Sequence, residues 1–360
     1  MGGRLRLPDS LHAVIMAGGR GERFWPLSTP RRPKPFVEGL FERSLFRMTV
    51  DRLRHVLPMD RIWVILGADH VPIVREQAND LPPERLIVEP LARDTACAIT
   101  LAAMVLAREV GPDTMMLVLP CDHWIHPVDG FWMTVYEAAT VLDEFPDAEI
   151  VFGVRPNRPE TAYGYIQPGS PLRTGVYAVR AFHEKPDTRT AVRYLEEGYF
   201  WNAGIFLWRV DRILALVERF LPETAAALHT AMTDFGTDRF AAALQQAYAR
   251  VHPISIDYGV MEHADSIWMV EAAFAWDDVG QWEALDRILP KNEAGNIVCG
   301  NATLMNTRNT VVVNTSGWIG VMGVEDVVII RDGDRVLVMR KGHGARLKHL
   351  VRMLPQEWKE

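Results

Sequence analysis

The alternation of short apolar runs with amphipathic stretches limits the folds open to this chain. Between Leu11 and Leu119, expected strands and helices follow one another at 12–17, 44–57, 61–66, 71–79, 86–88, 95–108 and 115–119. Such alternation is typical of a mostly parallel sheet with helices on both faces, and these sheets bind ligands beyond the carboxyl ends of their strands. We therefore expect an α/β fold whose informative loops follow Ala17, Leu119 and similar strand ends.

The helix expected at 44–57 has Ser44 as its N-cap, and Asp94 is expected to cap the helix that runs to residue 108. Strands and helices continue in mixed order to residue 275, but after Pro290 the pattern changes to short β segments broken by Gly, Asn and Asp. We expect a main domain over 1–290 and a small β-rich domain over 291–360, for which a short left-handed β-helix is one arrangement.

Composition excludes several classes of protein. The chain has 360 residues, of which 48% are hydrophobic. This length and composition predict a folded globular protein with a substantial hydrophobic core. The net charge of −7 argues against non-specific nucleic-acid binding, and no apolar run reaches the roughly 18–20 residues of a membrane span. Three widely spaced cysteines fit neither a disulfide framework nor a metal cluster, which favours a cytoplasmic location.

Glycines follow the first expected strand. Gly18, Gly19 and Gly21 let backbone N–H groups approach an anion closely, and Arg23 adds positive charge. A P-loop would close with Gly-Lys-Ser/Thr, and a dinucleotide fingerprint would have a third glycine that opens a helix. Here two aromatic residues and a proline follow Arg23 instead, so the loop predicts phosphate binding of another kind.

Lysine is used sparingly. Of six lysines, only Lys34 and Lys185 fall in the first 290 residues, and a proline follows each. An ammonium suits point contact with one phosphate oxygen, whereas guanidinium favours two-pronged pairing. The lysine pair therefore indicates a phosphate-handling enzyme, with chance placement as the alternative.

Eight collinear motifs within about residues 11–285 resemble those of the sugar-phosphate nucleotidyltransferases. The stretch 17–28, with Pro33-Lys34-Pro35-Phe36, resembles the family signature, and its Trp-Pro-Leu-Ser ending resembles the mannose-1-phosphate guanylyltransferases in particular. The other motifs are Glu89-Pro90 with 92–96, then 119–123, 160–166, 182–187, 201–206, 255–258 and 276–280.

This resemblance implies a Rossmann-like nucleotidyltransferase fold that transfers a nucleotidyl group from GTP to mannose 1-phosphate, giving GDP-mannose and pyrophosphate. It implies catalytic roles for Arg23, Lys34, Asp122 and Asp278, with Mg²⁺ on the two aspartates and Asp277 as a less favoured neighbour. The implied nucleotide-binding residues are Ala17, Gly18, Gly19, Gly21, Glu89, Asp94 and Thr95. The implied sugar-phosphate residues are Gly164, Glu184, Lys185, Asn202 and Asp257.

Two positions depart from the family pattern: relatives usually have Asn at Asp94 and Pro at Cys97, which bears on base selectivity. Relatives often carry a downstream isomerase domain, for which 360 residues leave no room, so we expect a single activity. The terminal β segment makes a homodimer one expectation. The alternatives are a related nucleotidyltransferase with another sugar 1-phosphate or NTP, and a non-catalytic GTP or sugar-nucleotide sensor.

Overall fold

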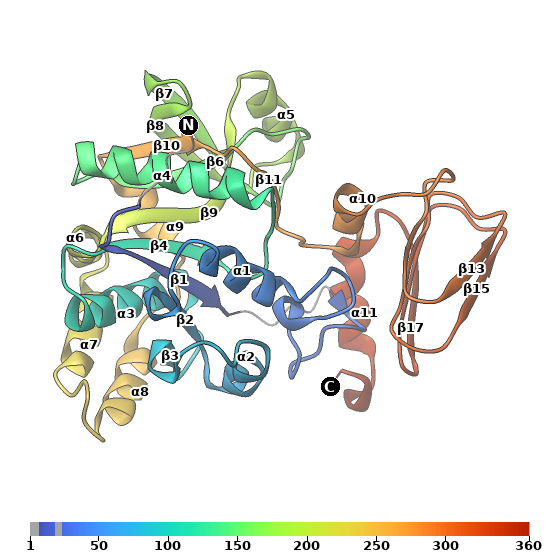
Figure 1. Ribbon diagram of the computed structural model, residues 1–360, viewed down its shortest axis with the longest axis horizontal. Coiled ribbons are helices and arrows are strands. Elements are labelled where there is room, and N and C mark those ends of the chain that lie inside the picture. Colours follow the sequence, from blue (N-terminus) through green and yellow to red (C-terminus); the bar gives the residue numbers. More distant parts are fainter. Residues whose placement is uncertain (1–6, 19–23, 360) are drawn as a thin grey trace.

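The computed structural model describes residues 7–18 and 24–359, and its main feature is a sheet with the strand order β3-β2-β1-β4-β9-β6-β10-β8-β7 (Figure 1). The strands are β1 (Leu11–Ala17), β2 (Ile62–Gly67), β3 (Leu86–Glu89), β4 (Met115–Pro120), β6 (Glu149–Val154), β7 (Gly164–Arg173), β8 (Val176–Glu184), β9 (Phe200–Arg209) and β10 (Ile267–Glu271).

Strands β3, β2, β1 and β4 pair in parallel, so their carboxyl ends share one edge of the sheet. β6 and β10 form a second parallel pair. β9 enters between β4 and β6 and is antiparallel to both, while β7 and β8 extend the far edge as an antiparallel hairpin. The expected α/β fold class is confirmed, and the antiparallel β9 is a detail that the sequence pattern did not predict.

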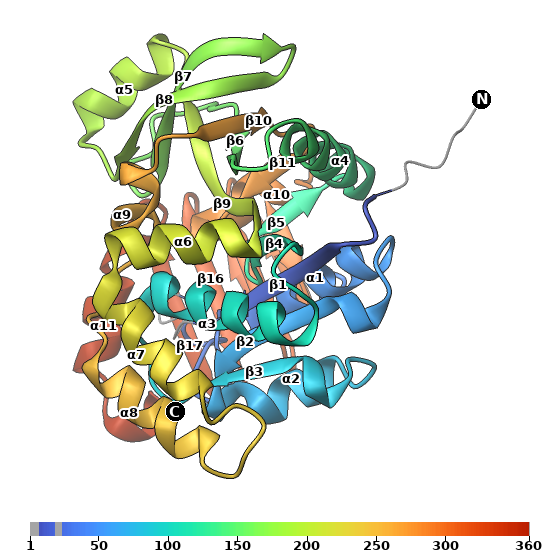
Figure 2. The same ribbon diagram turned by 90° about the vertical axis from the view of Figure 1, so that its left-hand side faces the viewer.

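Helices cover both faces of the sheet (Figure 2). One face carries α1 (Leu45–Arg54), α2 (Val71–Gln77), α4 (Val128–Glu144) and α5 (Thr188–Glu196). The other carries α3 (Asp94–Glu109), α6 (Val210–Phe220), α7 (Pro222–Met232) and α8 (Phe240–Arg250). Each face has its own buried cluster, because alternate side chains of every strand point to opposite sides.

The two expected helix caps have different outcomes. The Ser44 hydroxyl accepts a hydrogen bond from the Arg47 N–H, so the predicted cap of α1 is confirmed. The cap predicted for α3 is wrong: Arg93 holds the N-cap position without a side-chain hydrogen bond. Asp94 is the first residue of α3, with φ of 63°, and its carboxylate accepts from the adjacent Thr95 N–H instead.

The chain after residue 290 forms stacked short strands. β12 (Ile297–Cys299), β14 (Val311–Asn314) and β16 (Val327–Asp332) pair in parallel, and β17 (Arg335–Arg340) closes that sheet antiparallel to β16. β13 (Ala302–Met305) and β15 (Ile319–Met322) form a second parallel pair. Parallel strands stacked in two sheets give the expected β-helix-like arrangement; its handedness and the boundary at residue 290 stay predictions.

A third buried cluster joins this C-terminal unit to the N-terminal third of the chain. Phe24, Trp25 and Leu27 pack in one core with Val313 and Ile330, and with Leu347 from the helix α11 (Leu347–Met353). Figure 1 shows α11 between the large sheet and the stacked strands. The C-terminal unit thus supports the segment that directly follows the glycine-rich signature.

In the described part of the chain, no helix combines the length and apolarity needed to cross a membrane.

Candidate active site

Lys34 lies at the centre of a cluster of oppositely charged groups. It begins a short 3₁₀ turn between two prolines and is only 8% exposed. Its Nζ lies 2.7 Å from Asp122 Oδ2 and donates to the backbone carbonyl of Asp278 at 2.6 Å. The structure therefore brings together three of the four residues predicted to be catalytic, from positions up to 244 residues apart. The fourth, Arg23, lies outside the described residues.

Asp122 follows β4 at the carboxyl edge of the sheet. Burial is the largest single influence and by itself would raise the pKa of this carboxyl, but the charge and hydrogen bond of Lys34, together with His123 and the backbone, outweigh burial and lower it. Its neighbour His123 accepts a hydrogen bond on Nδ1 from Trp276 Nε1 at 3.0 Å, and burial lowers the pKa of the imidazole. A neutral His123 therefore carries its proton on Nε2, which lies 3.7 Å from Asp122 Oδ1. From this position His123 can orient the Asp122 carboxylate.

Asp278 and Asp277 have different surroundings, although they are adjacent. Asp278 Oδ1 accepts from the Tyr163 hydroxyl at 2.7 Å and from the Gly280 N–H at 3.0 Å. Both oxygens of buried Asp277 accept from the Arg287 guanidinium, at 2.6 and 2.9 Å. A carboxylate held in a two-pronged ion pair is a poor candidate ligand, so Asp277 has a structural role and Asp278 is the better metal candidate.

Tyr163 is a site residue that the sequence did not single out. Burial and the nearby Asp278 charge raise the pKa of its phenol, which stays protonated and donates to Asp278. The alternation in Ala162-Tyr163-Gly164-Tyr165 is equally compatible with core packing, and the carboxylate partner lies 115 residues away. A local sequence pattern therefore gave no signal for this contact.

The donor set at Lys34 fits a magnesium ion that is shared with substrate. Within residues 7–18 and 24–359, no group of three or more His, Cys, Asp or Glu side chains is arranged to hold a metal. Asp122 contacts the Lys34 ammonium through its carboxylate and Asp278 through its backbone carbonyl, so both residues lie at one place suited to positive charge, while the Asp278 carboxylate is held by Tyr163 and Gly280. Mg²⁺ typically takes one or two carboxylates and completes its shell with waters and substrate phosphates. Two aspartates therefore suffice.

All five residues predicted to bind the sugar phosphate form a second cluster. Gly164 pairs with Glu184 across β7 and β8, and a Cβ at Gly164 would collide with the Glu184 carboxylate. Lys185 Nζ lies 3.0 Å from Glu184 Oε1, and Asn202 Nδ2 donates to Asp257 Oδ1 at 2.8 Å. The cluster thus presents carboxylates, an amide and an ammonium together.

Two of these polar groups are already partnered within the protein. The Asn202 amide oxygen accepts from the Gly204 N–H at 3.0 Å, in addition to the bond that its Nδ2 makes to Asp257. Burial, reinforced by the charge of Glu184, raises the pKa of Asp257 to about 6. The half-buried Asn202 amide therefore does not require a sugar hydroxyl as its partner, and a sugar contact there stays a prediction.

A pocket of about 680 Å³ opens at the carboxyl ends of β1, β2 and β3. Gly18, Gly67 and Glu89 line its sheet side, which places two of the predicted nucleotide-binding residues there, and Ala17 is the buried last residue of β1. Tyr248 donates to Glu89 Oε1 at 3.1 Å, and burial raises the pKa of Glu89 to about 7. The opposite wall is formed by α11 and the residues after it.

The remaining predicted nucleotide residues are placed differently. Asp94 and Thr95 begin α3 and are not among the residues that line this pocket. The Thr95 hydroxyl accepts from the Ile256 N–H at 2.9 Å, so it fixes α9 (Ile256–Gly259) against α3. Gly19 and Gly21 lie outside the described residues.

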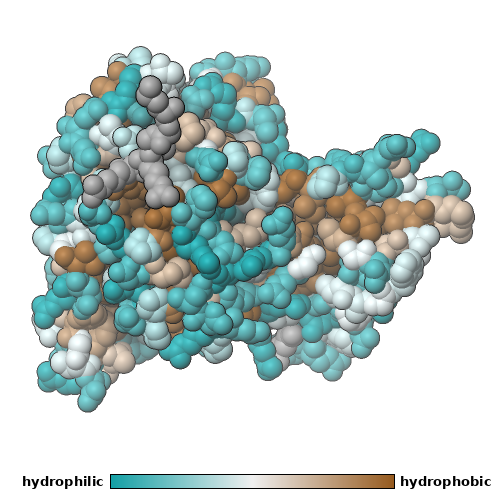
Figure 3. Space-filling model, viewed as in Figure 1, coloured by the Kyte–Doolittle hydropathy of each residue, from teal (hydrophilic) through white to brown (hydrophobic). Residues whose placement is uncertain are grey.

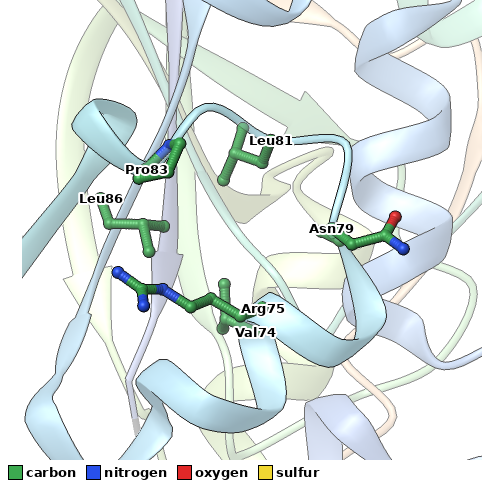
Figure 4. Close-up of a pocket in the computed structure, with 7 residues that line it drawn as sticks. Val74, Arg75, Asn79, Leu81, Pro83 and Leu86 are labelled. Atoms are coloured by element: carbon green, nitrogen blue, oxygen red, sulfur yellow. The ribbon is translucent and has the colours of Figure 1, made fainter.

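A smaller pocket of about 250 Å³ lies between α2 and β3 (Figure 4). Mostly apolar side chains line it, among them Val74, Leu81 and Leu86, with Arg75 at its side. It contains none of the predicted site residues, so the chemistry belongs at the carboxyl edge of the sheet.

Comparisons with known proteins agree with this geometry. Residues 12–294 match the nucleotidyl transferase family, and residues 300–354 match the MannoseP isomerase/GMP-like beta-helix domain. The chain is 35% identical to a mannose-1-phosphate guanylyltransferase of Sinorhizobium fredii, over 97% of this chain and 68% of that protein. It is 36% identical to one of Klebsiella pneumoniae, over 95% and 74% respectively. The crystal structure of mannose-1-phosphate geranyltransferase from Thermus thermophilus superimposes with a TM-score of 0.86 at 36% identity, covering 95% of this chain and 98% of that one.

Proposed function

We infer the reaction of this chain from the fact that it belongs to the nucleotidyl transferase family. The inferred reaction transfers the guanylyl group of GTP to mannose 1-phosphate and releases pyrophosphate. Relatives named mannose-1-phosphate guanylyltransferase, which match nearly the whole chain, support this choice of substrates. The observation that carries the mechanism is the buried Lys34 ammonium, held between the Asp122 carboxylate and the Asp278 carbonyl.

The reaction requires little covalent chemistry from the protein itself. The attacking oxygen of a sugar phosphate is already an anion, so neither a general base nor a protein nucleophile is required. The protein has to place that oxygen in line with the α-phosphorus and neutralise the charge that develops there. Lys34 is suited to this task because Asp122 and Asp278 fix its position before substrate binds, which lowers the cost of reorganisation.

Asp122 and Asp278 would hold Mg²⁺, which when bound supplies positive charge to the phosphate oxygens. The Tyr163 hydroxyl fixes the orientation of the Asp278 carboxylate through Oδ1. His123 Nε2 lies beside Asp122 Oδ1 and so restricts the orientation of the Asp122 carboxylate. These neighbours would keep both carboxylates aligned, as outer-shell partners do at other metal sites.

The second lysine would bind the other phosphate. Lys185 adopts φ of 47° at the end of β8, and its side chain is 60% exposed beside Glu184. An exposed ammonium next to hydrogen-bond acceptors suits a sugar phosphate, because the ammonium meets the phosphate while Glu184 and Asp257 accept from sugar hydroxyls. In this proposal Lys34 acts on the nucleotide phosphate and Lys185 on the sugar phosphate.

A homodimer through the C-terminal unit is a further part of the proposal. Figure 3 shows hydrophobic side chains gathered over this unit. Met305, Trp318, Met322, Val336 and Val338 are all more than half exposed. Apolar surface of this kind marks interaction sites when it is contiguous. The cytoplasmic location expected from the cysteines stays a prediction.

A pyrophosphate-release assay tests the proposed reaction. Purified protein with Mg²⁺ is offered GTP, ATP or UTP, each with mannose 1-phosphate or glucose 1-phosphate. We expect the highest kcat/KM for GTP with mannose 1-phosphate, and no release without a sugar phosphate. A preference for another pair would favour the related nucleotidyltransferase, and GTP binding without any pyrophosphate release would favour the sensor.

A further inference from the structure

We propose that the C-terminal helix α11 forms a wall of the nucleotide pocket and contacts the nucleotide there. Lys348 and Arg352 on this helix bind the terminal phosphates of the nucleoside triphosphate, and they also bind the pyrophosphate product. This inference rests on the proposed function, since it assigns the end of the triphosphate that leaves in that reaction. It gives the β-helix-like unit a direct contact with substrate.

The geometry places one face of α11 on the pocket. Lys348, Val351 and Arg352 line it at a spacing of three and four residues, which puts them on the same side of a helix. Gln356 and Lys359 continue this wall beyond the helix. Across the pocket lie Gly18, Gly67 and Glu89, at the strand ends where a nucleotide is expected. A nucleotide that fills the pocket therefore lies between the sheet edge and α11.

The wall is held firmly to the segment that follows the glycine-rich signature. Leu347, the first residue of α11, is 3% exposed and belongs to the same buried cluster as Phe24 and Trp25. Trp25 Nε1 donates to the carbonyl of Trp358 at 3.0 Å, which fixes the chain after the helix. These contacts position the cationic side chains against the pocket before any ligand binds.

Charge decides which part of the nucleotide faces α11. The helix side contributes Lys348, Arg352 and Lys359, although the chain as a whole carries a net charge of −7. The strand-end side contributes Asp69 and also Glu89, whose carboxyl is only partly ionised near neutral pH because burial raises its pKa to about 7. A nucleoside triphosphate combines a base that carries hydrogen-bond donors with a polyanionic tail. The tail is repelled by carboxylates and attracted to ammonium and guanidinium groups, so it extends towards α11.

The two side chains suit two kinds of phosphate contact. Lys348 is half-buried and offers a point charge, whereas the exposed Arg352 offers a planar fork for two oxygens. The ammonium of Lys359 donates to the Arg352 carbonyl at 3.0 Å and adds positive charge to the same end of the wall. Sequence patterns gave no indication of this role, because these residues follow Pro290, where no motif of the family was found.

A nucleotide series measures the contact directly. Isothermal titration calorimetry with Mg²⁺ compares GMP, GDP, GTP and inorganic pyrophosphate on the full chain and on the Lys348→Gln/Arg352→Gln double variant. We expect Kd to rise about tenfold or more for GTP and pyrophosphate, since hydrogen bonds to charged groups are among the stronger ones, and less than about twofold for GMP. Arg346→Gln removes an exposed arginine just before α11 that does not line the pocket, and it should leave all four affinities unchanged.

Two results would overturn the inference. Unchanged affinity for GTP and pyrophosphate in the folded double variant would show that α11 does not bind phosphate. An equal loss for GMP and GTP would place α11 against the base or ribose instead. Because no sugar phosphate is present, these outcomes are independent of turnover: wild-type protein that binds pyrophosphate through α11 but makes no GDP-mannose contradicts the proposed function alone.

Discussion

Replacement of Lys34 by glutamine removes a group that contacts both candidate metal-binding residues, Asp122 and Asp278. Glutamine retains a polar end of similar reach but carries no charge. The wild-type ammonium makes a 2.7 Å contact with Asp122 and a 2.6 Å contact with the Asp278 carbonyl, so the substitution leaves both partners without their cation. We expect effects on catalysis and on stability that can be measured separately.

The catalytic effect should be the larger one. A preorganised group that stabilises transition-state charge contributes roughly 2.7–4 kcal/mol, which corresponds to a loss of about 10²–10³ in kcat. Removing one member of a fully buried ion pair costs about 3–5 kcal/mol of stability. Lys34 is 9% exposed but the Asp122 side chain is 33% exposed, so water can solvate the remaining carboxylate and we expect a smaller loss, about 1–2 kcal/mol.

The pH dependence of kcat tests the role of Lys34 independently of the size of the rate loss. In the wild type, Lys34 is the strongest of the groups that together outweigh burial and lower the pKa of Asp122, so they favour the ionised carboxylate. Without Lys34 the strongest of these favourable contacts is lost, so the pKa of Asp122 rises. The acidic limb of kcat should therefore move to higher pH in the variant.

The assay is steady-state pyrophosphate release with both substrates saturating, together with thermal unfolding followed by circular dichroism. Lys291→Gln is the matched control, because Lys291 is 40% exposed and pairs with Asp286 at 3.4 Å, away from this cluster. The control should keep wild-type kcat. A folded Lys34→Gln protein with normal kcat, or with a loss confined to KM for GTP, would refute the role given to Lys34.

Three further substitutions test other parts of the site. Lys185→Gln should raise KM for mannose 1-phosphate about tenfold and change kcat and KM for GTP much less, because its exposed ammonium is assigned to the sugar phosphate; a kcat effect as large as that of Lys34→Gln would contradict the assignment. Tyr163→Phe should raise the Mg²⁺ concentration needed for half-maximal activity about tenfold, since it removes a hydrogen bond to Asp278, and an unchanged Mg²⁺ titration would exclude this role. Asp257 has a pKa raised to about 6, so its stabilising effect is present below about pH 4 and is lost as pH rises through 6; Asp257→Asn should flatten this fall in melting temperature, and parallel curves for the two proteins would count against it.

The large elements were predictable because their signals are local. A buried strand followed by glycines marks β1, and a serine before an apolar periodic stretch marks α1 with its cap. The direction of β9 carries no such signal, because an apolar run of ten residues can pair in parallel or antiparallel. Asp94 misled in the opposite way: an acidic residue before a helix usually caps it, but here a left-handed φ turns its carboxylate to the adjacent N–H.

The residues of the candidate site also differ in whether a local sequence signal predicts them. Lys34, Asp122 and Asp278 could be named from motifs, and their convergence in space agrees with that choice. The resemblance already favoured Asp278 over Asp277, and the structure adds a physical reason for this choice, because Arg287 pairs with both Asp277 oxygens. Tyr163 and α11 were missed because their partners lie in distant parts of the chain. Contacts of this kind depend on tertiary packing and leave no periodic trace in the sequence.

The stereochemical course of a single turnover tests the central claim, direct guanylyl transfer from GTP to mannose 1-phosphate by charge neutralisation alone. GTP with one sulfur of defined configuration on the α-phosphorus is incubated with mannose 1-phosphate and the wild-type protein, and the product is analysed by ³¹P NMR. The account predicts a thio-analogue of GDP-mannose with inverted configuration, because one in-line displacement inverts the phosphorus. Retention would reveal two displacements through a covalent guanylyl-enzyme, and the absence of any sugar nucleotide would contradict the transfer itself.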